Sequence, residues 1–394
     1  MTETTPPTIN DLFGGSELDP LPNPHPVWSR LRRETPILYV KGMIYEFYLV
    51  TSAELAHEVM ANDTVFSNAV YAEGVGMVLG KTILEMDGKA HLDHRKLASP
   101  FLSPSALRGK FEVAANKIAN DLIDEFVDKG EADLISDFTF TYPLRVFTTI
   151  LDLPIDDYEQ VHQWAIDLCR VVSDPFLGMD SGAKFAAYLA PVVAERRGGS
   201  GTDLITMLCN SEVDGEQLSD EAVVNFLRLM ILAGAETTYH LLGSVMFGLL
   251  KNRDQFDAVL ADEKLVRSAI DEGLRWEAPV QIVSRVVTQS FELGGVQLKE
   301  GDKIHVSLGS ANRDEKRYPD PDRFDIYRNN EPAHEAFGHG RHFCMGSRVA
   351  YSESQIAIST LLKRLPNLRL KEGEECGIFG FSFRSPDRLP VQFG

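Results

Sequence analysis

Residues 219–250, SDEAVVNFLRLMILAGAETTYHLLGSVMFGLL, predict a single long helix through the middle of the protein. At about 1.5 Å of rise per residue, such a helix is nearly 50 Å long. Its apolar residues fall on almost every face, which is the pattern of a helix buried on all sides. The rest of the chain must surround it. Glu236 and His240 interrupt the apolar run and argue against a membrane span.

Helical periodicity dominates most of the chain. Between about residues 52 and 268, apolar residues recur at steps of three and four, as in amphipathic helices. Strands are predicted outside this region, in a hairpin that turns at Lys41 and Gly42, and in residues 283–314 and 381–393. The pattern therefore predicts a mainly α fold with small peripheral β-sheets.

Two stretches between the predicted helices, residues 67–82 and 173–182, contain glycines and no clear period. We expect them to be loops that could line a pocket. No internal repeat or linker separates two cores, so we predict one domain over residues 1–394, with residues 1–20 as a loosely ordered lead-in.

The charge of the chain excludes some classes of partner. It carries 58 acidic and 39 basic residues, a formal net charge of −19, which disfavours nucleic acid and anionic membrane surfaces. Its four cysteines include no C-x-x-C pair, which argues against a disulfide framework or a structural zinc site. The N-terminal residues lack the basic and apolar segments of a signal peptide. We therefore expect a cytoplasmic protein with no nucleic acid or membrane partner.

Three residues in the middle of the central helix are poor choices for a buried helix. Gly234 costs roughly 1 kcal/mol relative to alanine, Thr237 can bond back to the preceding turn, and a buried Glu236 needs a partner. Local rules are broken in this way mostly at functional sites. The alternative is a packing glycine followed by satisfied polar residues.

The second unusual stretch is AFGHGRHFCMGSRVAYSES, residues 336–354, where Cys344 precedes a long amphipathic helix. A helix N-terminus stabilises a thiolate through its free N–H groups and its dipole. Gly338, Gly340 and Gly346 leave room for something large and flat to approach the backbone. The alternative for an isolated cysteine is a buried thiol at a glycine-rich turn.

The string FGHGRHFCMG resembles the cysteine-ligand loop of the cytochrome P-450 family, the haem-thiolate monooxygenases, whose pattern is F-G-x-G-x-H-x-C-x-G. Every specified position is matched. The resemblance implies an α-rich triangular prism that encloses haem b, with Cys344 as the iron ligand. It also implies haem contacts from four further residues of this loop, of which the last donates to a propionate: Phe337, Gly338, Gly346 and His342. Tyr351 departs from the family, in which many members have a basic residue at this position.

The string AGAETT in the central helix resembles the oxygen-binding groove of the same family. The resemblance places Ala233 against the haem, and makes Thr237 the alcohol and Glu236 the acid of the catalytic pair. Such a pair is suited to passing protons from solvent to dioxygen.

Three further strings support the resemblance. Glu272 and Arg275 are three residues apart, and with Arg323 they resemble the structural Glu-Arg-Arg cluster of the family, although E-x-x-R alone is usually an exposed ion pair. The resemblance assigns the haem propionates to cationic donors from separate segments, which a buried anion requires. These donors are His91, Arg95 and Arg285.

The resemblance implies insertion of one oxygen atom from dioxygen into an organic molecule, with electrons from a separate ferredoxin and ferredoxin reductase. Candidate pocket residues are apolar and predict a hydrophobic small-molecule substrate. They are Leu229, Leu232, Val280, Ile282, Val283, Phe381 and Phe383. A basic face for the ferredoxin is expected at Lys96, Arg108, Lys110, Arg341 and Arg348.

Three other functions fit parts of this pattern. A peroxygenase would take hydrogen peroxide in place of dioxygen, but it would not need the Glu236–Thr237 pair. A haem-based sensor would use Cys344 without turnover, and no signalling or DNA-binding segment accompanies it. A cysteine nucleophile with His339 or His342 as base lacks an identifiable oxyanion or orienting group.

Overall fold

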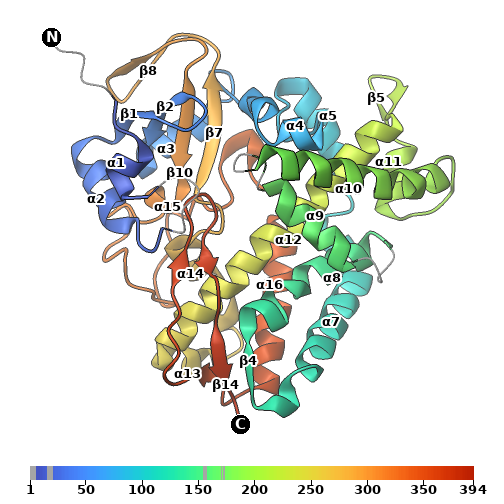
Figure 1. Cartoon of the computed structure of the whole chain (residues 1–394), viewed down its shortest axis with the longest axis vertical. Helices are drawn as coiled ribbons and strands as arrows, with labels where there is room; N and C mark the ends of the chain where they lie inside the picture. The colour runs from blue at the N-terminus through green and yellow to red at the C-terminus, as the bar shows by residue number, and fades with distance from the viewer. Residues whose placement is uncertain (1–5, 16–20, 154–157, 170, 172–173) are drawn as a thin grey trace.

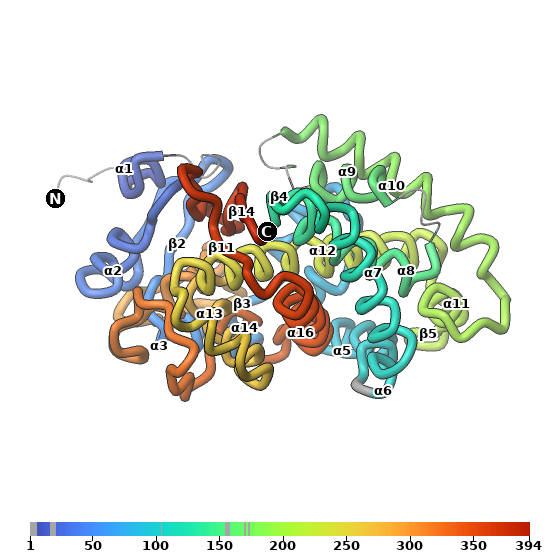
Figure 2. The backbone as a smooth tube through the Cα atoms, turned by 90° about the horizontal axis from the view of Figure 1, so that it is seen from below, coloured from blue at the N-terminus to red at the C-terminus, as the bar shows by residue number. Residues whose placement is uncertain are grey.

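The predicted central helix is the axis of the molecule. In the computed structural model it is α12 (Asp220–Lys251), one continuous helix whose N-terminus is capped by the side chain of Ser219. It crosses the middle of the molecule in Figures 1 and 2, between the N-terminal sheet and the outer helices. Most of its residues are buried, and four helices pack most extensively against it, so the prediction of a core helix is confirmed. Those helices are α8 (Thr141–Ile150), α10 (Pro175–Arg196), α14 (Leu265–Trp276) and α16 (Ser347–Arg364).

The structure describes residues 6–15, 21–153, 158–169, 171 and 174–394. The remaining α-helices are α1 (Ile9–Phe13), α2 (His25–Glu34), α3 (Ala53–Ala61), α4 (Gly76–Leu79), α5 (Gly88–Ala98), α6 (Pro104–Ala106), α7 (Glu112–Asp124), α9 (Tyr158–Cys169), α11 (Leu204–Cys209), α13 (Arg253–Ala261) and α15 (Leu308–Ala311). The strands are β1 (Ile37–Lys41), β2 (Glu46–Val50), β3 (Phe66–Ser67), β4 (Glu131–Asp133), β5 (Glu212–Val213), β6 (Glu216–Gln217), β7 (Ile282–Val287), β8 (Phe291–Leu293), β9 (Val296–Leu298), β10 (Lys303–Ser307), β11 (Arg369–Leu370), β12 (Ile378–Phe379), β13 (Ser385–Pro386) and β14 (Pro390–Gln392).

The largest sheet lies at one side of the helical body, beside α3 (Figure 1). Its strand order is β1-β2-β10-β7-β3, so the N-terminal hairpin and the late strands form one sheet. The hairpin pairs Lys41 with Glu46 and turns at Gly42, as predicted. β7 is antiparallel to β10, with Arg285 opposite Ile304. Figure 2 shows α10 and α11 at the opposite end of the molecule from this sheet. The mainly α fold with small peripheral sheets is confirmed.

The prediction of a loop at 173–182 is wrong, because α10 begins at Pro175. The glycines there serve close packing instead of turns. A Cβ on Gly178 would lie 2.9 Å from Val171, and one on Gly182 would lie 3.1 Å from the carbonyl oxygen of Val78. Pro175 occupies the first turn of the helix, where its missing N–H has no consequence.

Two other predictions, a loop at 67–82 and a loosely ordered lead-in at 1–20, are also corrected. Residues 67–82 contain a 3₁₀-helix (Asn68–Glu73) and α4, although Asn68 and Tyr71 do line a cavity. Within the lead-in, residues 1–5 and 16–20 lie outside the described residues, but Ile9–Phe13 is a helix with a capping box at Thr8 and Asp11. The ring centroids of Phe13 and Trp28 are 4.5 Å apart. This part of the lead-in is packed, not loose.

Candidate functional site

One apolar cavity of about 310 Å³ lies between α12 and the loop that carries Cys344. Ala233 is exposed to it, although it lies in the middle of a helix that is otherwise largely buried. The cavity is lined by residues from most of the predicted motifs, far apart in sequence. Those that line it are His91, Arg95, Leu229, Ala233, Thr237, Val280, Val283, Arg285, Phe337, Gly338, His342, Cys344 and Gly346.

The cysteine loop is fixed by its backbone. The Cys344 amide donates to the carbonyl oxygen of Phe337 at 2.9 Å, which closes the loop. Gly338 and Gly340 have φ values of 70° and 71°, in the left-handed region that favours glycine. A Cβ on Gly340 would lie 2.6 Å from the carbonyl oxygen of Met60, at the end of α3. The glycines therefore allow the turn and its close approach to α3.

The Cys344 sulfur faces the cavity at the N-terminus of α16. Burial raises the pKa of its thiol, while the amides of Gly346 and Ser347 and the charge of Arg95 act in the opposite direction. An ideal Cβ on Gly346 would be 3.8 Å from the sulfur, which is ordinary van der Waals contact, and the glycine leaves that position empty. A soft, low-crowding sulfur ligand directed into an apolar cavity suits iron of a flat macrocycle.

An arginine and a histidine, both buried, line the same cavity. Arg285 is 5% exposed, and burial lowers its pKa. One of its guanidinium nitrogens donates to the carbonyl oxygen of Ser284 at 2.7 Å. His91 is 2% exposed, and its Nδ1 is buried without a hydrogen bond. An orphaned donor and a buried guanidinium beside an apolar wall indicate an anionic ligand with a large apolar body. The donor set therefore fits the two carboxylates of haem.

His342 is engaged by the protein. Its Nδ1 lies 3.1 Å from the Asn68 side-chain nitrogen, and its Nε2 lies 3.3 Å from an Asp87 carboxylate oxygen. Its ring centroid is 4.0 Å from that of His91. His342 lines the cavity beside His91, and its expected donation to a propionate stays a prediction.

The groove on α12 is built from Ala233, Gly234 and Thr237. The Thr237 hydroxyl donates to the carbonyl oxygen of Ala233 at 2.8 Å, the back-bond expected from its sequence position. A Cβ on Gly234 would lie 2.2 Å from the ring of Phe147, which fills the space beside the helix. The glycine is needed for this close contact with α8.

Glu236 does not line the cavity. It is 9% exposed, and its carboxylate lies 3.4 Å from Nε2 of His240, one turn along α12. The Nδ1 of His240 in turn lies 2.6 Å from the Ser385 hydroxyl. The predicted acid thus has the partner that its burial requires.

Four predicted pocket residues are absent from the cavity wall: Leu232, Ile282, Phe381 and Phe383. Leu232 lies on another face of α12, within the helical core, and Ile282 packs against the N-terminal cluster. The Phe381 ring stacks at 6.2 Å on Trp28, in that same cluster. Phe383 is bridged to Val280 through its backbone, and its ring faces His240. These four residues were predicted to line the substrate pocket, and they do not line this cavity.

The Glu-Arg cluster is buried, not an exposed pair. Glu272 and Arg275 have fully buried side chains joined at 2.7 Å. The third member is Arg328, 3.4 Å from Glu272, and the prediction of Arg323 is wrong. Arg323 contributes only its carbonyl oxygen, which accepts from Arg275 at 3.2 Å. Both arginines lie in a segment of irregular backbone, where sequence spacing does not determine which side chain turns inward.

Sequence analysis named only part of the cavity wall. Phe147 lines it without having been predicted, whereas Asn68 and Tyr71 belong to the stretch 67–82 that was expected to line a pocket, and the Tyr71 hydroxyl accepts from the Ser284 amide at 3.0 Å. Arg228 was also missed: it is 5% exposed and donates to the carbonyl oxygens of Val78, Leu79 and Gly182. A lone arginine near the start of an apolar helix could have indicated a buried side chain that donates to carbonyl oxygens of neighbouring segments.

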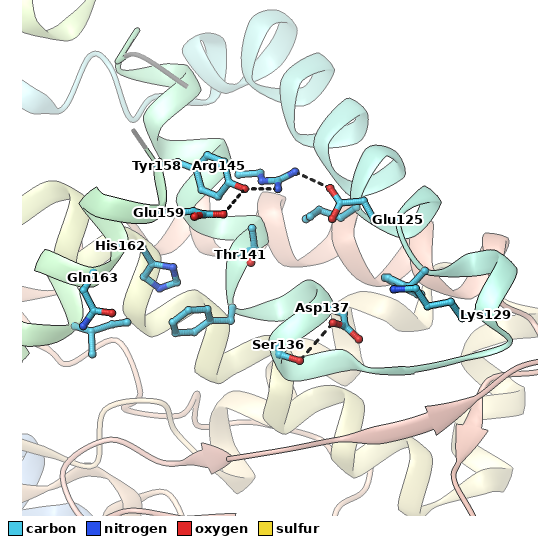
Figure 3. Close-up of a pocket in the computed structure, with 14 residues that line it drawn as sticks. Glu125, Lys129, Ser136, Asp137, Thr141, Arg145, Tyr158, Glu159, His162 and Gln163 are labelled. Carbon is cyan, nitrogen blue, oxygen red and sulfur yellow. Dashed lines mark hydrogen bonds and ion pairs between the residues drawn. The ribbon is translucent and has the colours of Figure 1, made fainter. Parts of the chain in front are cut away.

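A second pocket, of about 380 Å³, lies between α7, α8 and α9 (Figure 3). In Figure 3 the Arg145 side chain lies between Tyr158 and Glu125, which it bonds at 2.7 and 3.1 Å. Its wall is mainly polar and contains none of the cysteine-loop residues. The pocket is therefore separate from the candidate site.

Comparisons with known proteins agree with the motifs. Residues 184–379 match the family model described as Cytochrome P450. The chain is 35% identical over 319 residues to Cytochrome P450 107B1 of Saccharopolyspora erythraea, which covers 80% of this chain and 78% of that protein. It is 36% identical over 294 residues to the steroid C26-monooxygenase of Mycobacterium tuberculosis, with 73% and 78% covered.

The fold has close counterparts among solved structures. P450BioI, solved with a hexadec-9Z-enoic acid ligated acyl carrier protein, matches with a TM-score of 0.87 at 29% identity. The match covers 94% of this chain and 99% of that one. In the described part of the chain, no helix is long and apolar enough to cross a bilayer.

Proposed function

We propose that this chain, which belongs to the cytochrome P450 family and is a haem-dependent monooxygenase, binds haem b through Cys344 and oxidises a hydrophobic small molecule. One observation carries the assignment of the site. The same apolar cavity contains the Cys344 loop and the Ala233–Thr237 groove of α12, with Arg285, a buried cation, in its wall.

When bound, haem supplies the redox chemistry that activates dioxygen. The chain's own residues hold it and exclude water. Cys344 provides the sulfur ligand, and Arg95, Arg285 and His91 bind the carboxylates. Phe337 and Gly346 form the apolar surface on the sulfur side.

The proton-handling groups are Thr237 and Glu236. The Thr237 hydroxyl lies at the cavity and can donate a hydrogen bond to water there. Glu236 can pass protons toward it, supported by its contact with His240. This pair favours dioxygen over hydrogen peroxide as the oxidant, because a peroxygenase has less need for delivered protons.

The substrate we propose is apolar and held mainly by shape. Leu229, Val280, Val283 and Phe147 line the cavity, and its surface is largely non-polar. A steroid C26-monooxygenase and a fatty-acyl-binding P450BioI are among the similar proteins. These relatives support an aliphatic or terpenoid-like substrate class.

We propose ferredoxin and ferredoxin reductase as electron donors. All five basic residues predicted to bind ferredoxin are exposed: Lys96, Arg108, Lys110, Arg341 and Arg348. Arg341 pairs with Asp63 and Lys96 with Asp93, both at 2.8 Å, so these two contribute less free charge. We expect charge reversal at Lys96, Arg108 and Arg348 together to slow reduction by ferredoxin and to leave ligand binding intact.

We also propose a single domain in a cytoplasmic protein. The N- and C-terminal parts are joined by Arg384, which donates to the carbonyl oxygen of Leu21 and to Glu277. Three cysteines among the described residues are free, which suits a reducing compartment: Cys209, Cys344 and Cys376.

The first test is the absorption spectrum of the reduced protein under carbon monoxide. A strongly red-shifted Soret band supports thiolate ligation, and apolar ligands that shift the oxidised spectrum then identify the substrate class. Turnover with dioxygen and ferredoxin, compared with turnover on hydrogen peroxide, separates the monooxygenase from the peroxygenase. A protein that incorporates no haem would overturn the site assignment.

A further inference from the structure

Three metal-binding side chains converge where α3 meets the cysteine loop, outside the cavity. They are His57 on α3, and Glu335 and His339 on the segment that leads to Cys344. One ligand atom from each lies within 4.8 Å of the others. The cavity lining includes none of the three, so the haem site does not account for their approach.

Rigid elements hold the two histidines together. His57 lies one turn before Met60, whose carbonyl oxygen packs against Gly340. The ring centroids of His57 and His339 are consequently only 3.9 Å apart. Little chain ordering would be needed to bind a ligand between them, because the backbone on both sides is already fixed.

Glu335 is the anchored carboxylate of the cluster. It is 3% exposed, and its amide donates to the Asn312 side chain at 2.7 Å. Its Oε1 lies 3.1 Å from Nδ1 of His57 and accepts from Arg317 at 2.9 Å. Every side-chain hydrogen bond recorded for it among the described residues ends on Oε1, which leaves Oε2 available.

Arg317 is the main argument against a cation here, because its positive charge already pairs with Glu335. Arg317 also donates to the carbonyl oxygen of Ala333 at 2.7 Å, so it has a second acceptor. Arg317 can therefore keep its contact with Oε1 while the Oε2 atom of Glu335 binds a cation. The His57 side chain is 47% exposed, which leaves a route for an ion from solvent.

We propose that His57, His339 and Glu335 form a binding site for Zn²⁺, with water as the fourth ligand. Two imidazoles and one carboxylate are a zinc ligand set, and an exposed histidine on one side leaves the last tetrahedral position open. Mg²⁺ and Ca²⁺ prefer oxygen ligands and would bind poorly. The net charge of −19 raises the local concentration of divalent cations.

The consequence is a crosslink between α3 and the loop that ends at Cys344. Zinc would hold residues 335–339 against α3 at the protein surface. The site does not depend on the proposed monooxygenase chemistry, because it uses none of the haem-binding residues.

The experiment uses the haem-containing protein with no affinity tag, dialysed against Zn²⁺ and then analysed for metal per polypeptide. We expect one tightly bound zinc in the wild type. His57→Ala and His339→Ala should each weaken binding at least tenfold. His94→Ala is the matched control, because His94 lies on α5 outside the cluster, and it should bind zinc as the wild type does.

Two further measurements test the ligand set. Zinc should slow amide hydrogen exchange in residues 335–339 of the wild type, and Mg²⁺ should not. Glu335→Gln, which keeps the side-chain size, should weaken zinc binding with an unchanged far-ultraviolet circular dichroism spectrum. Absence of stoichiometric zinc, or equal binding by the wild type, His57→Ala and His339→Ala, would overturn the proposal whether or not the protein proves to be a monooxygenase.

Discussion

The two sides of the molecule bury their polar groups in opposite ways. The sheet side comprises the five-stranded sheet, α2, α14 and residues 312–346, and it buries charges in networks. The helical side comprises α7, α8, α10, α12 and α16, and it is held mainly by apolar packing. The cavity lies between them, with Cys344 at the end of the sheet side and Thr237 on the helical side.

Glu277 represents the sheet side. It is 2% exposed and contacts three cationic or basic groups: His25 at 3.0 Å, Arg384 at 2.8 Å and Arg313 at 3.3 Å. Burial would raise its pKa, but these partners hold the pKa of Glu277 well below its ordinary value. The network joins α2, the end of α14 and the C-terminal segment, so specific partners fix the relative positions of distant parts of the chain.

Glu353 represents the helical side. It lies on α16, is fully buried, and neither carboxylate oxygen has a hydrogen-bond partner. Burial raises its pKa well above the ordinary value, which favours the neutral acid over the carboxylate. At this position the helical side holds a buried carboxyl group without a network, whereas Arg228 and Glu236 on α12 do have partners. The comparison teaches that the sheet side, which ends in the Cys344 loop, is fixed by directional contacts, whereas the α12 wall of the cavity depends mainly on packing.

The largest effect is expected at the boundary between the two sides. Cys344→Ser should remove the red-shifted Soret band of the reduced carbon monoxide complex and abolish turnover, because only the thiolate supplies that ligation. Cys376→Ser is the control, since Cys376 does not line the cavity. Retention of the band in Cys344→Ser would show that the iron ligand lies elsewhere.

Breaking the sheet-side network should cost more stability than any exposed ion pair. Glu277→Gln leaves three basic groups without their carboxylate, and we expect a loss of about 3–5 kcal/mol in the free energy of unfolding. Because the folded pKa is lowered, the stability from Glu277 is present above pH 4.5, its ordinary pKa, and is lost as the pH falls. The difference between wild type and Glu277→Gln should therefore shrink in acid.

Urea denaturation at several pH values measures this difference. Glu131→Gln is the control, because its pair with Lys371 is largely exposed and should contribute less than about 1 kcal/mol. A Glu277→Gln variant as stable as Glu131→Gln would contradict the contrast between the two sides.

On the helical side, function should depend on the Thr237 hydroxyl. Thr237→Ala should lower the product formed per electron pair about 10- to 100-fold, because proton delivery loses its donor. Binding of an apolar ligand, measured by the spectral shift, should stay nearly unchanged. Thr237→Ser keeps the hydroxyl and should recover most of the yield, and a serine variant as uncoupled as alanine would argue for a packing role.

The smallest effect is expected at Glu353, and it should have the opposite sign. Glu353→Leu removes an unpartnered polar group and should stabilise the protein by about 1 kcal/mol at neutral pH. Since the folded pKa is raised, the wild type loses stability as the pH rises above 4.5, the ordinary value. The gain from Glu353→Leu should therefore grow with pH. Destabilisation by the leucine at pH 7 would indicate a partner for the carboxyl group.

The sequence predicted the parts of the site that come from one continuous segment. Cys344, Phe337 and Gly346 belong to one loop, and Ala233 and Thr237 to one helix, so their relative positions follow from local geometry. Cavity contacts at Arg285 and His91 followed from the family resemblance, since no local pattern identifies them. The same holds for the fold, in which α12 was predicted to within one residue at each end.

The parts that failed depend on long-range packing. Phe381 and Phe383 lie in a hairpin segment whose register against α12 no local pattern determines. Gly178 and Gly182 were interpreted as turn residues, although they permit close contacts within and beside α10. The cysteine spacing that was searched for zinc sites could not have predicted the cluster of His57 and Glu335. These residues are far apart in sequence and are brought together only by the fold.

The side chains at positions 147 and 234 together set the space in the cavity, because each limits the size of the other. The Phe147 ring occupies the space where a side chain at position 234 would lie, and it also lines the cavity. A smaller residue at position 147 would enlarge the cavity and at the same time make room for alanine at position 234. Variation in one position therefore changes which residues the other can accept, so substrate range in this lineage can be altered stepwise through compensating pairs without rebuilding α12.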